Sequence, residues 1–390
     1  MLLRNVSIIG KEGLKDISIE DGIIDSVNRI ENSISKNEKV SNIFFNNVIA
    51  FPGLINSHDH LDFNLFPALK NRTYKNYKEW GKDIQDNNKK EIDKVLQIPQ
   101  PLRTQFGIYK NLLNGFTTVV NHGKHLKIED ELINVFQNTH SIHSVGFEKN
   151  WKWKLNNPFK NKWLVSMHVG EGKDEASHQE ISQLIKWDFL KRKIIGIHGV
   201  AMDENQAEQF HALVWCPASN YFLLNKTAAI DFLKDRTTIL FGSDSTLTSS
   251  WNIWEHIRLA RNEKMLTDKE LFDSLTSKPA EIWGLHNYGK IENGNYADII
   301  IAKKRNQQND YDAFFSLNPE DILLVMHKGN IKLFDAELET QLNESDIEIT
   351  EFCRISINGQ IKYVKGKLPQ LIKEIKKYYL ESNFPFEVLH

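Results

Sequence analysis

The sequence predicts a parallel α/β fold, either a doubly wound sheet or a barrel, flanked by β-rich ends. Short apolar runs alternate with helix-compatible stretches through the middle of the chain. Both ends instead carry short strand-like runs joined by turn signals. The length of 390 residues, 41% of them hydrophobic, suits one large α/β domain with a satellite domain.

The first fifty residues have the pattern of short strands. Ile17–Ile19 and Ile23–Val27 flank Glu20-Asp21-Gly22, and an Asp-Gly pair between such runs is typical of a hairpin. A further apolar run, Asn47–Phe51, ends at Pro52-Gly53. We therefore expect residues 1–50 to form the N-terminal part of a β-domain.

From residue 51 to about residue 290 the pattern changes to alternation of strands and helices. Helix-compatible segments such as Ala176–Phe189 and Ile253–Glu263 separate runs that are short, apolar and bounded by polar residues or glycine, as buried parallel strands are. These runs are Thr117–Val120, Trp163–Met167, Ile194–Ile197, Ala212–Trp215 and Thr238–Phe241.

After Gly289 the short strands return. Asn293-Gly294, Gly329-Asn330 and Asn358-Gly359 each lie between strand-like runs, and Leu368–Leu380 has the pattern of an amphipathic helix. The two β-rich ends favour a single discontinuous β-domain, made from residues 1–50 and 291–390, with residues 51–290 inserted between them.

Composition excludes several classes of protein. The net charge of −2 gives no whole-molecule field for nucleic acid or an anionic membrane, and we interpret the basic stretch Lys186–Lys193 as a solvated face. Cys216 and Cys353 provide no disulfide framework and no cysteine-rich zinc site. The start, Met1–Asn5, is not typical of a signal peptide, and no apolar run is long enough for a bilayer. We expect a cytoplasmic protein with a small-molecule substrate and no nucleic-acid or membrane partner; its oligomeric state stays open.

Histidine and aspartate side chains follow several of the predicted strands. His58 and His60 end the first run, where alternate residues point the same way, but fourteen His placed at random give about half an H-x-H pair. Three further runs lead into His168, His198 and Asp244. Barrel active sites lie at the C-terminal ends of strands, and imidazoles with a carboxylate suit zinc or another divalent transition metal.

Glu171 lies three residues beyond His168. A carboxylate beside a metal site can take a proton from water and deliver it to a leaving group. The alternative is an exposed Glu at the start of the following helix, where the helix dipole favours a negative charge. The neighbouring His168 favours the catalytic interpretation.

These segments together resemble the amidohydrolase superfamily, in the branch of cytosine deaminase, guanine deaminase and the chlorohydrolases. The similar segments occur in the family's order and cover nearly the whole chain. They are Pro52–His60 (first strand), His168–Gly172 (H-x-x-E), His198–Asp203 (sixth strand), Cys216–Asn220 (C-P-x-S-N), Gly242–Ser245 (G-T-D-S, with Ser for Thr) and Gly289–Ile301 (re-entry into the β-sandwich). The resemblance implies a (β/α)8-type TIM barrel with a β-sandwich from both termini.

The resemblance also implies a role for each site residue. His58, His60, His168 and Asp244 would hold one divalent metal ion, zinc by the residue types, with iron or manganese open. Glu171 would shuttle protons, His198 would hydrogen-bond the hydrolytic water or the intermediate, and Asp244 could also accept the water proton. A metal-activated water then attacks an sp² carbon, as in unrelated zinc deaminases that use a non-ligating Glu.

One part of the chain departs from the family pattern. Only residues 148–162 separate the predicted third strand, Ser141–Phe147, from the run that ends in His168, which is too short for a whole strand–helix unit. We therefore expect the fourth βα unit to be deleted or reduced. Binuclear relatives carry a bridging lysine there, but none of the lysines present ends a convincing strand: Lys149, Lys152 and Lys154.

His122 and His125 follow the second barrel-type run on the side of the barrel where the substrate would bind. They are candidates for substrate contacts; the alternative is that they are ordinary loop residues.

The leading functional hypothesis is deamination of a small, cyclic, nitrogen-containing molecule. Hydrolysis of an amide, a carbamate or a halide on the same site is the second hypothesis. The third is a non-catalytic scaffold that kept the fold. Such a scaffold should lose metal ligands, whereas this sequence retains all of them.

Overall fold

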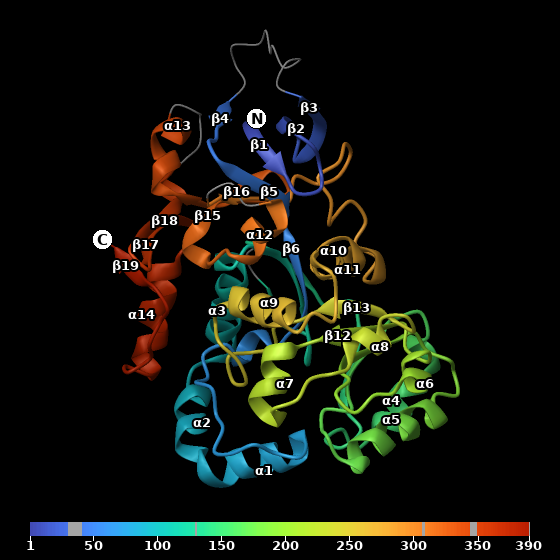
Figure 1. Ribbon diagram of the computed structural model, residues 1–390. Helices are drawn as coiled ribbons and strands as arrows, with labels where there is room; N and C mark the ends of the chain where they lie inside the picture. The colour runs from blue at the N-terminus through green and yellow to red at the C-terminus, as the bar shows by residue number, and fades with distance from the viewer. Residues whose placement is uncertain (30–40, 129–130, 306–308, 344–348, 390) are drawn as a thin grey trace.

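A barrel of eight short parallel strands forms the lower half of the molecule in Figure 1, a computed structural model that describes residues 1–29, 41–128, 131–305, 309–343 and 349–389. Backbone hydrogen bonds join β6 to β8 in one sheet and β9 to β13 in another. The first and last strands meet where the Asp244 amide donates to the His58 carbonyl (3.1 Å). The strands are β6 (Leu54–Asp59), β7 (Phe116–Asn121), β8 (Asn134–Phe136), β9 (His140–Ser144), β10 (Val165–Val169), β11 (Ile194–His198), β12 (Ala212–Trp215) and β13 (Thr238–Phe241).

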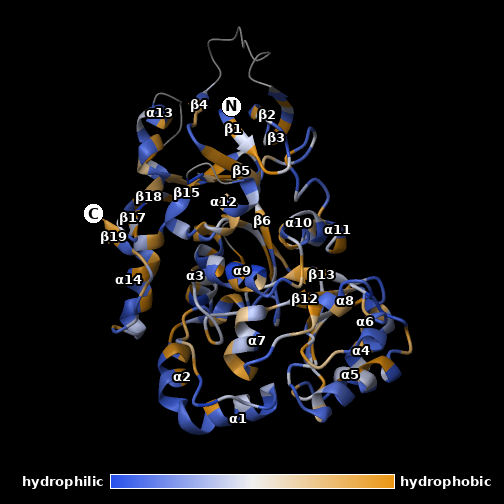
Figure 2. Ribbon diagram, in the orientation of Figure 1, coloured by the Kyte–Doolittle hydropathy of each residue, from blue (hydrophilic) through white to orange (hydrophobic). Residues whose placement is uncertain are grey.

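Helices cover the outside of the barrel. Every residue of β10, β11 and β12 is buried, as expected of parallel strands with both faces covered. Figure 2 shows hydrophobic residues on β12 and β13 and mainly hydrophilic ones on the outlying α1. The helices of this half are α1 (Tyr77–Asn87), α2 (Lys89–Leu96), α3 (Gln100–Leu113), α4 (Trp151–Leu155), α5 (Glu175–Trp187), α6 (Glu204–Ala207), α7 (Pro217–Leu224), α8 (Ile230–Leu233), α9 (Ile253–Asn262), α10 (Asp268–Asp273) and α11 (Ser277–Ile282).

The third barrel unit differs from the sequence prediction, whereas the fourth is reduced, one of the two expected outcomes. The predicted third strand is β9, the fourth of the barrel, because β8 precedes it. Only residues 137–139 separate β8 from β9, so the third unit has no helix. The segment 148–162 holds the five-residue α4 and a 3-10 turn at Pro158–Lys160, so the fourth unit is shortened and not deleted. A three-residue strand such as β8 is too short to show a periodic pattern in the sequence.

A mixed sheet built from both ends of the chain forms the upper half of the molecule in Figure 1. Its order is β19-β17-β18-β16-β15-β14-β5-β1-β2-β3, with β4 beside β1. The predicted fold, a TIM barrel with a β-sandwich from both termini, is confirmed. The strands are β1 (Leu2–Ile8), β2 (Leu14–Glu20), β3 (Ile23–Arg29), β4 (Asn42–Phe44), β5 (Val48–Pro52), β14 (Ile299–Lys303), β15 (Ile322–His327), β16 (Asn330–Asp335), β17 (Phe352–Ile357), β18 (Gln360–Lys365) and β19 (Glu387–Leu389).

Three helices belong to this half: α12 (Asp310–Phe315), α13 (Glu339–Asn343) and α14 (Leu368–Tyr378). The amphipathic pattern of α14 is confirmed, since Leu368, Leu371, Ile372 and Ile375 are buried on one side of it. Of all the helices in the described ranges, none has the length and apolarity that a bilayer span needs.

The predicted Asp-Gly hairpin joins β2 to β3. Asp21 and Gly22 have φ values of 48° and 79°, the two positive values that a type I′ turn needs. A Cβ atom on Gly22 would lie 2.7 Å from the Lys328 carbonyl oxygen, so a second hairpin turn packs against this one. Glycine is required here for both its backbone conformation and its lack of a side chain.

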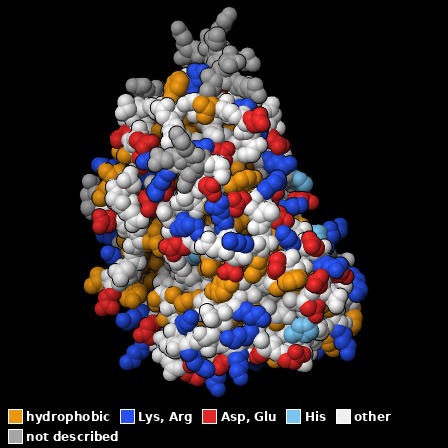
Figure 3. All heavy atoms as spheres, viewed as in Figure 1, with side chains coloured by type: hydrophobic (Ala, Val, Ile, Leu, Met, Phe, Trp, Pro, Cys, Tyr) orange, Lys and Arg blue, Asp and Glu red, His pale blue; other side chains and the backbone are white. Residues whose placement is uncertain are grey.

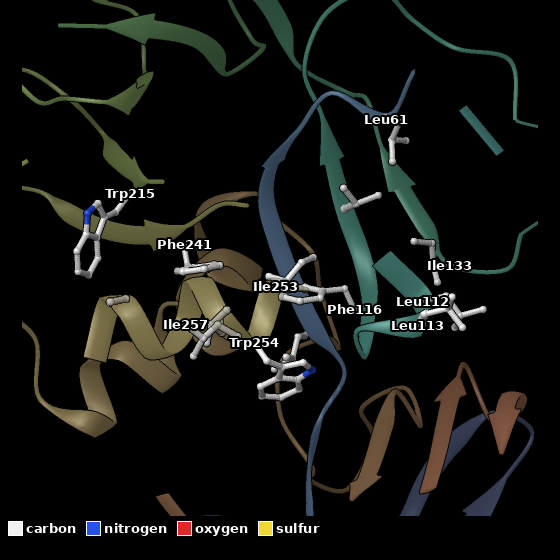
Figure 4. Packing of buried hydrophobic residues seen from close by; sticks show 14 of the residues in the cluster. Leu61, Leu112, Leu113, Phe116, Ile133, Trp215, Phe241, Ile253, Trp254 and Ile257 are labelled. Atoms are coloured by element: carbon white, nitrogen blue, oxygen red, sulfur yellow. The ribbon is translucent and has the colours of Figure 1, made fainter. Parts of the chain in front are cut away.

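A cluster of aromatic rings joins the two halves of the molecule. Phe314 of α12 lies edge-on to Phe51 of β5 (ring centroids 5.0 Å apart) and to Trp254 of α9 (5.2 Å). Figure 4 shows Trp254, with its α9 neighbours, packed beside Phe116 and Phe241 of the barrel. The barrel and the terminal sheet therefore share one hydrophobic core at this point.

Phe314→Ala is expected to lower the free energy of unfolding by about 3–5 kcal/mol, because it removes a fully buried ring at this junction. Urea unfolding followed by tryptophan fluorescence measures the change. Phe232, 59% exposed on α8, is the control, and its replacement by Ala should stay within about 0.5 kcal/mol of the wild type. Equal destabilisation by both substitutions would contradict the role assigned to the junction.

Candidate metal centre and active site

The predicted metal ligands meet at the C-terminal ends of the barrel strands. His58 lies in β6 and His60 directly follows it, His168 lies in β10, and Asp244 lies three residues after β13. His198, the last residue of β11, joins the same cluster. His58, His168, His198 and Asp244 are buried, and the His60 side chain is 14% exposed.

The donor atoms of this cluster face one another. Nε2 of His168 lies 3.2 Å from Nε2 of His58, and Oδ1 of Asp244 lies 3.8 Å from Nε2 of His58 and 4.0 Å from Nε2 of His60. Two triads share His58, and in each of them the donor atoms lie within 4.8 Å of one another: His58–His60–His168 and His58–His198–Asp244. Such spacing brings the donor atoms within reach of one common cation.

The electrostatics of the cluster suit metal ligation. Burial lowers the pKa of His58 and of His168 well below the usual value, and neighbouring His residues add to the effect. Both imidazoles are therefore neutral near pH 7, as ligands must be. Burial acts to raise the pKa of Asp244, but His60, His198 and donated hydrogen bonds lower it overall, so this carboxyl is ionised. Neutral imidazoles and one carboxylate fit zinc, iron or manganese.

Hydrogen bonds orient the Asp244 carboxylate. Its Oδ2 accepts from Ser219 Oγ (2.8 Å) and from Thr248 Oγ1 (3.0 Å), while Oδ1 accepts from the Ser245 amide (2.7 Å) and faces the imidazoles. Asp244 and His198 both have left-handed φ values, 57° and 75°. Non-glycine residues in this region are strained, and such strain is concentrated at functional sites.

Glu171 is buried beside His198 and does not begin the next helix. Its Oε2 lies 3.7 Å from Nε2 of His198, and it is 7% exposed. The helix α5 begins four residues later, with Asp174 as its N-cap, so the interpretation of Glu171 as an exposed helix-start residue is wrong. Burial raises the pKa of Glu171 well above the usual value, with further contributions from Asp244 and Glu180.

A hydrogen-bond chain fixes the tautomer of His198. Thr227 Oγ1 accepts from Trp215 Nε1 (2.7 Å) and from Asn220 Nδ2 (3.1 Å), which orients the amide of Asn220. Asn220 Oδ1 is then an acceptor for the Nδ1–H of His198 (2.8 Å). The Nε2 atom of His198 is left with a free lone pair that faces Glu171. Burial lowers the pKa of His198, so its ring is neutral.

A cavity of about 80 Å³ opens beside Glu171. Within the described ranges its lining includes no Lys or Arg. The lining side chains are His60, Phe63, Tyr77, Trp80, His143, Phe147, His168, Glu171, His198, Asp244, Ser245, Leu247 and Thr248.

Sequence reasoning missed the aromatic wall of this cavity and His143 of β9. His143 keeps solvent access, yet loss of hydration among its neighbours lowers its pKa to about 4, so its imidazole is neutral near pH 7. Its ring centroid lies 4.9 Å from that of His168. Its place at the end of a strand is the same signal that identified His168, and recognising β9 as a barrel strand could have found it. Tyr77 and Trp80 come from α1, whose first amide donates to the Glu171 carbonyl (3.0 Å).

The structure separates the two candidate substrate-contact residues. His122 is buried against the cluster, its ring centroid 4.5 Å from that of His168, and it is not among the cavity-lining side chains. His125 is exposed on the loop after β7 and does not line the cavity either.

The three lysines that follow β9 also lie away from the cavity. Lys154 pairs with Glu148 (2.7 Å), the ammonium of Lys152 lies 3.9 Å from the centre of the Trp187 ring, and Lys149 is exposed.

A buried polar network lies behind the cluster. The ammonium of Lys110, 2% exposed, donates to Asn64 Oδ1 (2.8 Å) and to the Asp244 carbonyl (3.0 Å), and it lies 3.3 Å from Asp59 Oδ2. Asp59 is fully buried and also accepts from Asn111 (2.8 Å). The network links the backbone of Asp244 to β6, the strand that contains His58 and that His60 directly follows.

Lys110→Met is expected to lower the free energy of unfolding by about 3–5 kcal/mol, because it leaves the Asp59 carboxylate buried without its cation. Chemical denaturation measures the change. The double variant Lys110→Met/Asp59→Asn removes both charges and should regain most of the stability. A double variant as unstable as the single one would show that charge pairing is not the reason.

Comparisons with known proteins agree with this geometry. The model of the amidohydrolase family matches residues 152–332. The 5-methylthioadenosine/S-adenosylhomocysteine deaminase of Caldicellulosiruptor saccharolyticus is 25% identical over 87% of this chain and 94% of its own length. The 5'-deoxyadenosine deaminase of Methanosphaera stadtmanae is 22% identical over 89% of this chain and 96% of its own.

Among solved structures, the atrazine chlorohydrolase TrzN from Arthrobacter aurescens TC1, complexed with zinc, has the same fold. The TM-score is 0.66 at 17% identity, covering 88% of this chain and 98% of that one. The chain is therefore similar to the amidohydrolase family over residues 152–332, and the relatives that span most of its length and the barrel with its histidine cluster agree with that similarity.

Proposed function

We propose that this protein is an amidohydrolase that deaminates a small, uncharged, cyclic nitrogen-containing molecule, with ammonia as the second product. The observation that carries the proposal is the buried Glu171, with its raised pKa, at the wall of a cavity that also contains the histidine–aspartate cluster. A buried carboxyl group whose pKa is raised can be protonated when a proton must be given and can take one back afterwards.

One divalent ion, with zinc as the leading candidate, would be held by His58, His60, His168 and Asp244. When bound, such an ion supplies a Lewis acid that makes a water molecule acidic enough to react near pH 7. Asp244, which is ionised, can accept a proton from the water. His198, through the free lone pair on Nε2, can accept a hydrogen bond from the attacking oxygen.

Glu171 would complete the proton transfers. Water adds to the sp² carbon that bears the amino group, and one water proton passes by way of Asp244 to the adjacent ring nitrogen. Glu171, in its protonated form, delivers a proton to the amino nitrogen, the carbon–nitrogen bond breaks and ammonia departs. The hydroxyl proton returns to Glu171 as the carbon becomes a carbonyl. Tyr77, whose amide holds the Glu171 carbonyl, keeps the acid at the cavity wall.

The cavity lining supports the substrate class. Phe63, Trp80, Phe147 and Leu247 provide flat and apolar contacts, which suit a planar ring. A phosphate or carboxylate on the substrate would meet no cation among the described lining residues. The two relatives are named as deaminases, of 5-methylthioadenosine/S-adenosylhomocysteine and of 5'-deoxyadenosine, which supports deamination as the reaction class.

Hydrolysis of an amide, a carbamate or a halide on the same site is the second candidate, and the shared fold of the chlorohydrolase favours it. A non-catalytic scaffold is disfavoured because the four proposed ligands lie together with their donor atoms facing inwards.

A screen of amines, amides and halides with metal-loaded protein, read out as ammonia, halide or acid released, tests these alternatives. Ammonia from an aminated ring supports deamination, and halide or acid release without ammonia contradicts it.

One tightly bound divalent metal per chain is expected, because the inward-facing donors form a single cluster and the candidate bridging lysines lie away from it. Elemental analysis of protein purified without added chelator measures the ratio. Two metals per chain, together with a modified lysine between residues 148 and 162, would contradict the mononuclear assignment.

A further inference from the structure

Two segments that are separate in the sequence form one surface on the barrel. Asn156 donates from Nδ2 to the Trp187 carbonyl (2.7 Å) and accepts at Oδ1 from the Phe189 amide (3.0 Å). The guanidinium of the buried Arg192 donates to the carbonyls of Leu155 (2.8 Å) and Trp163 (3.0 Å). Residues 148–163 and 186–193 are therefore held side by side, and we refer to them as the basic aromatic patch.

The basic aromatic patch is strongly positive. It contains nine basic residues and two acidic ones, a net charge of +7, in a chain whose net charge is −2. The ammonium groups of Lys152 and Lys160 each lie 3.9 Å from the centre of a Trp ring, so these cations cover aromatic faces. In Figure 3 the lower right, where α4 and α5 lie in Figure 1, carries basic and hydrophobic side chains together with acidic and histidine ones.

The same patch exposes large apolar side chains. Phe159 is 94% exposed, Trp153 82% and Phe189 67%. Of the twelve large hydrophobic side chains exposed in the described residues, five belong to this patch, since Leu190 and Trp163 are also exposed. Single exposed hydrophobic residues are common, but a cluster of them marks an interaction surface.

We propose that the basic aromatic patch binds the surface of a membrane that contains anionic phospholipids. Trp and Phe side chains enter the boundary between headgroups and acyl chains, while neighbouring lysines pair with the lipid phosphates and carboxylates. Each Lys near an anionic leaflet strengthens binding by about fivefold. The lysines and the exposed aromatic rings therefore both contribute to membrane binding.

Features of the patch favour lipid over other occupants. Its single guanidinium, on Arg192, is buried and donates to backbone carbonyls, so it is not available to pair with nucleic-acid phosphates. Phe159, Phe189 and Leu190 offer no hydrogen bond that could read a base. A second copy of the chain docking through the same patch would place +7 against +7.

The position of the patch leaves the active site open. The patch starts beyond the C-terminal end of β9, but the Lys154 carbonyl lies 2.9 Å from Nε2 of His140 at the start of that strand. Residues 156–163 precede β10 and residues 188–193 precede β11, so most of the patch lies at the N-terminal ends of the barrel strands. His168, His198 and Glu171 lie at the opposite, C-terminal ends. Membrane contact through the patch keeps the cavity accessible to a substrate from solution. The proposal revises the sequence-based expectation that Lys186–Lys193 is only a solvated face and that the protein has no membrane partner.

Co-sedimentation of the metal-loaded full chain with vesicles tests the proposal. The vesicles are phosphatidylcholine alone or phosphatidylcholine mixed with phosphatidylserine. We expect binding only to the mixed vesicles and weaker binding as salt is added. Lys162→Glu/Lys191→Glu should weaken binding by at least about 25-fold, and Trp153→Ala/Phe159→Ala by at least about tenfold.

Controls keep the test decisive. Lys90→Glu/Lys290→Glu makes the same charge change at exposed lysines outside the patch, and Phe232→Ala removes an exposed ring outside it; both should bind as the wild type does. Thermal unfolding and metal content of each variant check that the fold is intact. No binding to the mixed vesicles at low salt would overturn the proposal, as would equal loss in patch and control variants. Tighter binding of a single-stranded oligonucleotide through the same lysines, or self-association through the patch, would also overturn it.

Discussion

Glu171→Gln is expected to lower kcat by about 10²–10⁴ while the metal content stays at the wild-type value. Gln keeps the size and hydrogen-bonding capacity of the side chain but cannot carry the proton that the leaving nitrogen needs. The expectation rests on the position of Glu171, buried beside His198 and outside both donor triads. Turnover on the substrate found in the ammonia screen and elemental analysis of the same preparation measure the two quantities.

Glu175→Gln is the matched control, because Glu175 is the exposed first residue of α5 and lies outside the cavity. Its turnover should equal that of the wild type. If Glu171→Gln sheds its metal, Glu171 is a ligand and the assignment as proton shuttle is wrong. If Glu171→Gln turns over normally, the deaminase proposal loses its main support.

His168→Ala is expected to lose the bound metal and with it all turnover, because the substitution removes a donor that lies 3.2 Å from the His58 nitrogen at the centre of the cluster. His198→Ala should instead retain most of the metal and lose rate. Its Nδ1 is held by Asn220 and its Nε2 faces Glu171, so its proposed partner is the reacting oxygen. Metal content and kcat of both variants give the comparison.

Because a metal that binds only the folded state stabilises it, His168→Ala should also unfold at a lower temperature, close to that of the chelator-treated wild type. His286→Ala, at an exposed His outside the cluster, should change neither metal content nor unfolding temperature. Equal metal loss in His168→Ala and His198→Ala would make His198 a fifth ligand, as the triad His58–His198–Asp244 allows.

The metal cluster could be predicted from sequence because its donors occupy strand ends. A strand end in a barrel has a fixed place in space, so His168 and His198 needed only the recognition of β10 and β11. His143 also lies near a strand end, but finding it requires the recognition of β9 as a barrel strand. The preceding strand, β8, has only three residues and could not be recognised, so β9 was counted as the third strand instead of the fourth. The expected reduced unit at residues 148–162 is nevertheless in place, as the shortened fourth unit.

The aromatic wall of the cavity and the network behind it could not be predicted. Tyr77 and Trp80 reach the cavity because α1 folds back over it, held by a backbone hydrogen bond to Glu171 and the isolated bridge from Asn76 to Gly172. Lys110 meets Asp59 across 51 residues of sequence. Neither contact follows from periodicity or spacing, because both depend on how separate elements pack.

The pairing of β5 with β14 sets an order of events during protein synthesis. Phe51 of β5 lies opposite Ile300 of β14, so about 250 residues must leave the ribosome between a strand and its partner. At typical elongation rates this takes roughly 10–50 s. During that interval the first strands present an unpaired sheet edge, which is a template for wrong pairing with another chain. The barrel strands all emerge within the same interval, so nascent chains need either early barrel folding or a chaperone to protect that edge.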